Sequence, residues 1–483
     1  MVTLVMLHGW SVTSAETYGG LPEALAARAA DAGLELDIRN IHLGEYISFH
    51  DEVRVDDLAR AMDAALRKDV FGAELQGKPV DAPLPPFACI THSTGGPLAR
   101  RWADLFYGAD RIAACPMRQL VMLAPANHGS ALAAIGKQRI GRLKAWFSGV
   151  EPGQGVLDWL SLGSDEAFLL QENTLHYPEP QQSFFNFVLS GETIDRAFYD
   201  FLNSYLKEAG SDGVVRLAGA NMNYAFIRLV QGATQLSVFS AGANPDDLAI
   251  TELVMQPVPG LPPEPDGSLF HSPYLSPFLV VPYASHSGDK IGIMNSVTPD
   301  NAGNKPQVAA ILKCLQVNDG AAYTQLVAQF AAQTNASQEK RYTMLIFRIS
   351  DDQGRRIDDY DLLLLGEGYH PQLPKGVVID RQMNAASSAL VYYIDCDALG
   401  QIPQFGIRVV ARPAIGDGFA GYMAAEYRIE NTTGSSPLPP NQTLYIDIVL
   451  RRLVNRNATR FWPAQPRRKS FKDTEPDNGP YLD

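Results

Sequence analysis

A serine stands at the apex of a tight turn in the segment Phe87–Gly96, between an apolar run and a stretch of helical character. The residues around it are Thr91-His92-Ser93-Thr94-Gly95. A serine held on a sharp strand-to-helix turn can act as a nucleophile, and the usual form of such an elbow is G-x-S-x-G. Thr91 replaces the first glycine, at a point where the following helix packs close to the turn. The motif predicts a nucleophile at Ser93, and the alternative is a Ser/Thr-rich turn without chemistry.

A serine nucleophile needs a general base and an acid that orients the base. In hydrolases with such an elbow, the acid and then the histidine follow the serine along the chain. Asp212 lies in the turn Ser211–Val215, and His286 lies in a loop of small residues after an apolar run. The order and spacing of these residues predict that Ser93, Asp212 and His286 form a catalytic triad for acyl transfer.

Other acids and histidines are alternatives for these roles. Asp165 and Asp195 are the alternative acids, and His271 is the alternative base. His271 lies in a proline-rich region without a preceding apolar strand, which favours His286. His128 follows the next strand after the elbow, and we expect it to shape the pocket.

Acyl transfer also requires two backbone N–H groups directed at the developing oxyanion. The first should be the amide of Thr94, directly after the nucleophile. The second should come from the loop after the first strand, where Gly9 allows close approach and Trp10 supplies the amide. His8, at the end of that strand, is interpreted as a structural residue.

The elements that position these residues alternate over the first 300 residues. Strand-like apolar runs and helical segments follow one another, which predicts an α/β fold with a mostly parallel sheet covered on both faces. The predicted strands are Val2–Leu7, Glu35–His42, the elbow strand, Gln119–Ala124 and Phe184–Leu189, and the predicted helices include Tyr18–Ala32, Val55–Arg67 (with Asp51 as its capping candidate) and Pro97–Phe106.

Two stretches interrupt this alternation, at about 130–210 and 216–276, and we expect lid or cap insertions there. The first contains the basic amphipathic segment Lys137–Phe147, which is either a lid helix that meets lipid or an ordinary helix that covers the core. The second is rich in proline and glycine over Gly242–Ser276, which predicts a loop or lid.

From about residue 340 only short strand-like runs follow, separated by Gly, Pro and Asn, and these predict a β-sandwich-like domain. We therefore expect a catalytic domain at 1–335, an all-β domain at 340–464 and a disordered tail at 465–483. The predicted strands are Tyr342–Ile349, Asp359–Leu365, Ala389–Asp395, Gly406–Ala411, Gly421–Ile429 and Thr443–Leu453.

Composition narrows the class of protein. A net charge of −13 over 483 residues argues against general nucleic-acid binding. The four scattered cysteines predict buried free thiols and form no zinc motif.

The chain begins without a basic signal-peptide region and has no apolar run of the ~18–20 residues that span a membrane. We expect a location in the cytoplasm of the producing cell or export by a leaderless route.

Four segments together resemble the α/β-hydrolase lipases and esterases, in particular the acyltransferase-like and bacterial true-lipase groups. They are His8-Gly9, His92–Gly96, Leu123–Ser130 and Ser211–Val215. The resemblance covers about residues 1–300. It implies a serine carboxylester hydrolase, a lipase or phospholipase on lipid esters, with Ser93, Asp212 and His286 as the triad and no cofactor.

The resemblance also raises further expectations. Asp289 is a candidate calcium ligand, as in some bacterial lipases, although one carboxylate falls far short of the roughly 6–8 oxygens that calcium takes. A lipid substrate without a signal peptide suggests an antibacterial effector like the type VI secretion lipases, whose β-domain would meet a membrane, a delivery protein or an immunity protein. The alternatives are an acyltransferase with the same serine and a non-catalytic binding protein on a hydrolase fold.

Overall fold

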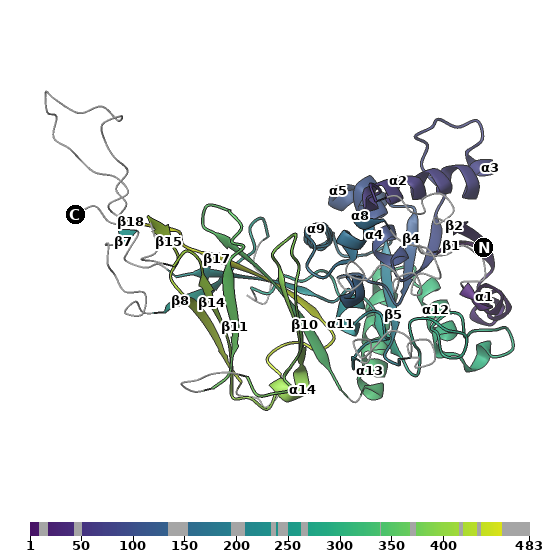
Figure 1. Ribbon diagram of the computed structural model, residues 1–483. Coiled ribbons are helices and arrows are strands. Elements are labelled where there is room, and N and C mark those ends of the chain that lie inside the picture. The colour runs from purple at the N-terminus through teal and green to yellow at the C-terminus, as the bar shows by residue number, and fades with distance from the viewer. Residues whose placement is uncertain are drawn as a thin grey trace, which may run out of the picture.

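The computed structural model describes most of the chain, and its residues are arranged around two large β-sheets (Figure 1). The described residues are 1–8, 18–42, 51–133, 153–194, 208–232, 238–239, 250–261, 269–338, 340–367, 373–414, 419–431 and 436–455. Trp10, Asp195, the segment Lys137–Phe147 and the tail 465–483 lie outside these ranges, so the predictions made for them remain predictions.

The first sheet is parallel and has six strands in the order β2-β1-β3-β4-β5-β9. Its strands are β1 Val2–His8, β2 Leu36–His42, β3 Phe87–His92, β4 Met117–Leu123, β5 Phe185–Gly191 and β9 Phe278–Val281. Every residue of β3 is buried, as expected for a central strand covered on both faces. The α/β class predicted from the sequence is confirmed.

Helices cover both faces of this sheet (Figure 1). A separate hydrophobic core lies between the helices and the sheet on each face. One face carries α1 Leu21–Ala29, α12 Pro306–Leu315 and α13 Gly320–Ser337. The other carries α2 Val55–Ala65, α4 Gly95–Phe106, α8 Gln154–Leu160 and α9 Asp165–Thr174. Short helices are α3 Gly72–Leu75, α5 Gly108–Arg111, α11 Leu217–Ala220 and α14 Cys396–Leu399. Within the described ranges, we find no helix that combines the length and the apolar character of a membrane span.

The capping residue predicted for α2 is wrong. The N-cap is Arg54, whose backbone N–H donates to the carboxylate of Asp57 at 3.0 Å. Asp51 instead accepts from the backbone N–H of Gln154 at 3.0 Å and thereby joins the start of α8 to this region. Both aspartates can accept backbone N–H groups, and the position at which the helix begins decides which of them caps it.

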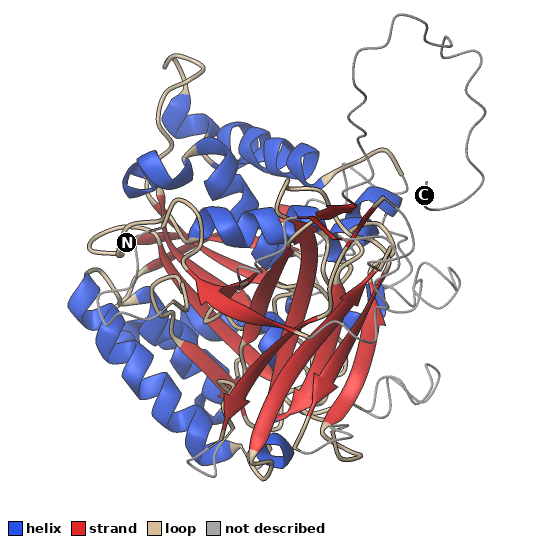
Figure 2. Ribbon diagram, turned by 90° about the vertical axis from the view of Figure 1, so that its left-hand side faces the viewer, coloured by secondary structure: helices blue, strands red, loops and turns tan. Residues whose placement is uncertain are grey.

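The second sheet is mixed and has nine strands in the order β11-β14-β16-β8-β6-β17-β10-β13-β12. They are β6 Ala225–Gln231, β8 Thr251–Gln256, β10 Tyr342–Asp351, β11 Tyr360–Leu365, β12 Val378–Met383, β13 Leu390–Asp395, β14 Gln404–Ala411, β16 Ala425–Glu430 and β17 Thr443–Leu450. A small sheet contains β7 Val238–Phe239, β15 Ala420–Gly421 and β18 Leu453–Asn455. In Figure 2 these strands face the viewer, and the helices gather around the parallel sheet.

The nine-stranded sheet curls until its two ends touch. Tyr392 on β13 donates from its hydroxyl to the backbone oxygen of Leu362 on β11 at 3.0 Å, although these strands lie near opposite ends of the strand order. The hydroxyl of Tyr360 on β11 donates to Ser388 O, just before β13, at 2.6 Å. The curled sheet encloses a hydrophobic core of its own. The all-β character predicted for the C-terminal part is confirmed.

Two interior strands of this sheet come from the stretch for which a lid or cap was expected. β6 pairs in parallel with β17 and in antiparallel with β8, and β8 also pairs in parallel with β16. The region Gly242–Ser276 therefore contains a strand in addition to loop. The parallel partners of β6 and β8, which are β17 and β16, lie more than 150 residues further along the chain, so local sequence pattern did not reveal these pairings.

The two sheets share buried contacts. His128, in the loop after β4, accepts at Nδ1 from the hydroxyl of Tyr445 on β17 at 2.8 Å and donates from Nε2 to Asn221 O at 2.7 Å. Thr443 on β17 donates to the backbone oxygen of Ala218 on α11 at 2.8 Å. Burial lowers the pKa of His128 to about 3, because the interior lacks the water that would stabilise an imidazolium, and the positive charge of Arg100 lowers it further. This histidine is therefore neutral in the folded protein.

The buried neutral state of His128 predicts a pH dependence of stability. The unfolded chain binds a proton at this residue below pH ~6.5, and the folded chain does so only near its lowered pKa, so stability is complete above pH ~6.5 and falls as the pH drops toward 3. Between these values the free energy of unfolding of the wild type should decrease faster than that of His128→Gln, by up to about 1.4 kcal/mol per pH unit. Urea unfolding from pH 7 to 4.5 measures both slopes, and parallel slopes would contradict the assignment.

Candidate active site

Ser93 occupies a strained turn between β3 and α4. Its φ of 53° lies in the left-handed region, which is costly for any residue other than glycine. The turn is held by backbone hydrogen bonds: Ser93 N donates to Leu123 O at 3.0 Å, and Ser93 O accepts from Gly96 N at 3.3 Å and from Ala126 N at 3.4 Å. This is the sharp strand-to-helix elbow that the sequence predicted, and it directs the serine hydroxyl to the carboxyl edge of the parallel sheet.

The close packing of α4 is possible because of Gly96. A Cβ atom at this position would lie 2.7 Å from Pro125 Cβ and 3.2 Å from Met122 Sδ. Thr91, which replaces the first glycine of the motif, is accommodated at the end of β3 and is fully buried. Its hydroxyl oxygen has no hydrogen-bond partner among the described residues. The substitution therefore fits sterically but leaves one polar atom uncompensated.

His286 brings the other two predicted residues together. Its Nε2 lies 3.1 Å from Ser93 Oγ, and its Nδ1 lies 2.9 Å from Asp212 Oδ2. Both His286 and Asp212 are buried. A carboxylate that accepts from Nδ1–H leaves Nε2 unprotonated and directed at the serine hydroxyl, which is the arrangement required of a general base.

The second oxygen of Asp212 is also satisfied. Asp212 Oδ1 accepts from the backbone N–H groups of Val214 and Val215 at 2.9 and 2.7 Å. The hydroxyl of Ser130, in the loop after β4, donates to Val214 O at 2.7 Å. This bond joins the turn that carries Asp212 to the loop after β4. With both of its oxygens bound, the carboxylate of Asp212 is held in place as an acceptor for the imidazole.

The backbone of His286 is held on both sides. His286 N donates to Asp212 O at 3.1 Å, and His286 O accepts from Nε2 of His92 at 3.0 Å. The rings of His92 and His286 lie 4.6 Å apart. Sequence reasoning did not assign this role to His92, and the signal that could have indicated it is a histidine at the end of a largely apolar strand, next to the nucleophile.

The remaining candidates lie elsewhere. Asp165 is half-exposed and forms an ion pair with Arg356 at 2.6 Å. His271 is buried and forms a bridge to Phe226 on β6, and its Nε2 accepts from Val258 N at 3.2 Å. Asp289 is exposed, and no cluster of three metal-ligating side chains occurs within the described ranges. The four cysteines are free and buried, as predicted.

Thr94 is the N-cap residue of α4, directly after the nucleophile. Its backbone N–H therefore stands where the first oxyanion donor was expected. The second expected donor, Trp10, lies outside the described residues. The assignment of the oxyanion hole to these two amides remains a prediction.

The unpartnered hydroxyl of Thr91 predicts the effect of a substitution. Thr91→Val keeps the shape of the side chain and removes a buried oxygen without a hydrogen bond, so the free energy of unfolding should rise by about 1 kcal/mol. Thr443→Val is the matched control, because this buried strand threonine donates to Ala218 O and its loss should cost about 1 kcal/mol. Urea unfolding of both variants tests the contrast, and an equal loss of stability in both would contradict it.

The chain is similar to solved structures over nearly its full length. Phospholipase PlaB from Legionella pneumophila is 37% identical, with a TM-score of 0.81, and the alignment covers 96% of this chain and 97% of PlaB. The complex of the same phospholipase with thio-NAD gives 36% identity, a TM-score of 0.81 and coverage of 96% and 98%. No protein-family model and no curated protein matches the chain. At this identity and coverage, the chain belongs to the α/β-hydrolase lipases and esterases and, within them, to the family of phospholipase PlaB.

Proposed function

We propose that this protein is a serine carboxylester hydrolase that acts on lipid esters, as a phospholipase or lipase. The observation that carries the proposal is the hydrogen-bonded series Asp212–His286–Ser93, with heavy-atom distances of 2.9 and 3.1 Å at an elbow with a strained serine. Such an arrangement activates a hydroxyl for attack on a carbonyl carbon. Membership of the family of a phospholipase supports a lipid ester as the substrate.

The mechanism follows from the positions of the three side chains. His286 Nε2 takes the hydroxyl proton as Ser93 Oγ bonds to the ester carbonyl carbon, and the carbonyl oxygen becomes an oxyanion that the amides of Thr94 and Trp10 stabilise. The intermediate collapses with cleavage of the ester C–O bond, and His286 gives the proton to the leaving alcohol. Water then attacks the acyl-serine with His286 again as the base. Asp212 holds the imidazole in the tautomer that this sequence of transfers requires.

Ser93→Ala removes the nucleophile and should lower turnover by about four orders of magnitude or more, because the base has no hydroxyl to activate. Asp212→Asn should lower it by about four orders of magnitude, since an amide favours the wrong tautomer of His286. Hydrolysis of a panel of p-nitrophenyl esters and phospholipids measures both losses.

Asp165→Asn is the matched control, because this aspartate is half-exposed and its charge pairs with Arg356, and its turnover should equal that of the wild type. Equal activity of the wild type and Ser93→Ala would contradict the proposed mechanism. A loss in Asp165→Asn as large as that in Asp212→Asn would contradict the assignment of the acid.

A further inference from the structure

A buried arginine closes the turn that presents Asp212. Arg216 follows Asp212 by four residues and is 3% exposed. Between them the backbone folds back on itself: Asp212 N donates to Val215 O at 3.2 Å, and Ser211 and Arg216 form an antiparallel bridge. Leu217 N donates to Gly210 O at 2.9 Å. A displacement of Arg216 therefore changes the position of the carboxylate of Asp212.

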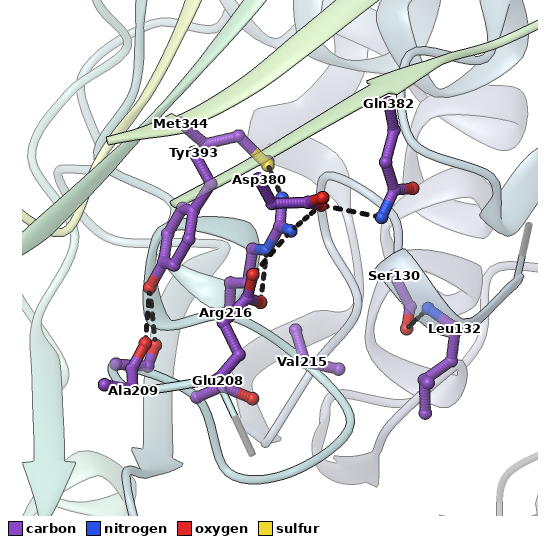
Figure 3. Close-up of polar contacts among 12 residues, drawn as sticks. Ser130, Leu132, Glu208, Ala209, Val215, Arg216, Met344, Asp380, Gln382 and Tyr393 are labelled. Carbon is purple, nitrogen blue, oxygen red and sulfur yellow. Dashed lines mark hydrogen bonds and ion pairs between the residues drawn. The ribbon is translucent and has the colours of Figure 1, made fainter. Parts of the chain in front are cut away.

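The nine-stranded sheet supplies most of the contacts of this arginine (Figure 3). The guanidinium binds Glu208 in bidentate geometry at 2.7 and 2.9 Å, and its Nη2 also pairs with Asp380 on β12. The guanidinium carbon lies 4.3 Å from the ring centroid of Tyr393 on β13, within the range of cation–π attraction. Met344 on β10 contacts Nη1 through its sulfur at 3.9 Å.

The same sheet also contacts the beginning of the turn. The hydroxyl of Tyr393 lies 3.1 Å from the backbone oxygens of both Ala209 and Gly210 and donates to them (Figure 3). Tyr342 stacks on Tyr393 with ring centroids 5.2 Å apart. A Cβ atom at Gly210 would clash with the ring of Tyr342 and the hydroxyl of Tyr393, so the turn lies in direct contact with both side chains. Both ends of the turn are thus fixed by side chains of the second sheet.

The buried charge of Arg216 depends on its two carboxylate partners, Glu208 and Asp380. Burial opposes the charge of Arg216, but its two carboxylate partners outweigh that effect and raise its pKa. Burial also raises the pKa of Glu208, in opposition to Arg216. When one partner of a buried ion pair is removed, the remaining charge is left poorly compensated and moves or recruits water. The position of Arg216 therefore depends on Asp380, which lies 164 residues away in the sequence.

We propose that Arg216 is a positioning residue for the triad, and that through it the nine-stranded sheet, chiefly Asp380 on β12, fixes the turn that carries Asp212. The nine-stranded sheet then contributes to catalysis, because it positions the acid of the triad. This inference rests on the proposed function, because it acts through the role of Asp212 as the partner of His286.

Asp380→Asn tests this inference, because the amide keeps the shape of the side chain and removes its charge. In the full-length protein, kcat for p-nitrophenyl butyrate should fall roughly tenfold with KM changed less than about twofold, since misplacement of a catalytic group affects the chemical step. In an Asp212→Asn background the same substitution should cause no further loss, because its effect passes through that carboxylate.

Two further measurements separate positioning from a loss of folded protein. A loosened Asp212 stabilises the imidazolium of His286 less, so the acid limb of the kcat/KM profile should move to lower pH in Asp380→Asn. Tyr393→Phe removes only the hydroxyl that binds Ala209 O and Gly210 O, and it should lower kcat in the same way.

Arg356→Gln is the matched control. It breaks a half-exposed ion pair with Asp165 on α9, which also joins the second sheet to the hydrolase part but lies outside the Asp212 turn, and it should leave kcat and the pH profile unchanged. An equal loss from Asp380→Asn in both backgrounds, or wild-type kcat in Asp380→Asn and Tyr393→Phe, would overturn the inference. Retention of full activity in Ser93→Ala would instead overturn the proposed function, so the two failures are distinguishable.

Discussion

The imidazole of His286 must contact two side chains that come from distant parts of the chain, and this constraint explains most of the architecture. Asp212 lies 74 residues and Ser93 lies 193 residues away in the sequence. The parallel sheet places the ends of β3 and β9 at one edge, where the serine elbow and the histidine loop meet. A backbone hydrogen bond from His286 N to Asp212 O and a hydrogen bond from the His92 side chain to His286 O then fix the loop. Side chains and backbone together leave the imidazole little freedom.

Asp212 lies where the two sheets of the molecule meet. Its carboxylate is held by the backbone of its own turn, and Ser130 holds that turn on the hydrolase side. Arg216 and Tyr393 attach the turn to the nine-stranded sheet. The two sheets share a buried boundary at which residues of β10, β13 and β17 join the hydrophobic core of the hydrolase part. The parallel sheet therefore supplies two members of the triad, and the boundary between the sheets supports the third.

The sequence was sufficient for the features that depend on local pattern and chain order. The apolar strands and the elbow at Ser93 have local signatures, and Asp212 and His286 could be predicted from their order along the chain after the elbow. The pairing of β6 with β17 could not be predicted, since an apolar run does not reveal its distant partner. The N-cap of α2 is Arg54 and not the predicted Asp51, because the helix begins three residues later than that capping residue would require. The contact of Arg216 with Asp380 required the folded chain, because neither residue belongs to a recognisable motif.

Activation of Ser93 by His286 can be measured directly by covalent labelling. A fluorophosphonate probe reacts with an activated serine, and mass spectrometry of the digested protein identifies the modified residue. We expect the folded wild-type protein to be labelled at Ser93, and His286→Ala and the urea-unfolded protein to remain unlabelled. Labelling of a different serine, or an unlabelled Ser93 in protein that still hydrolyses esters, would contradict this expectation.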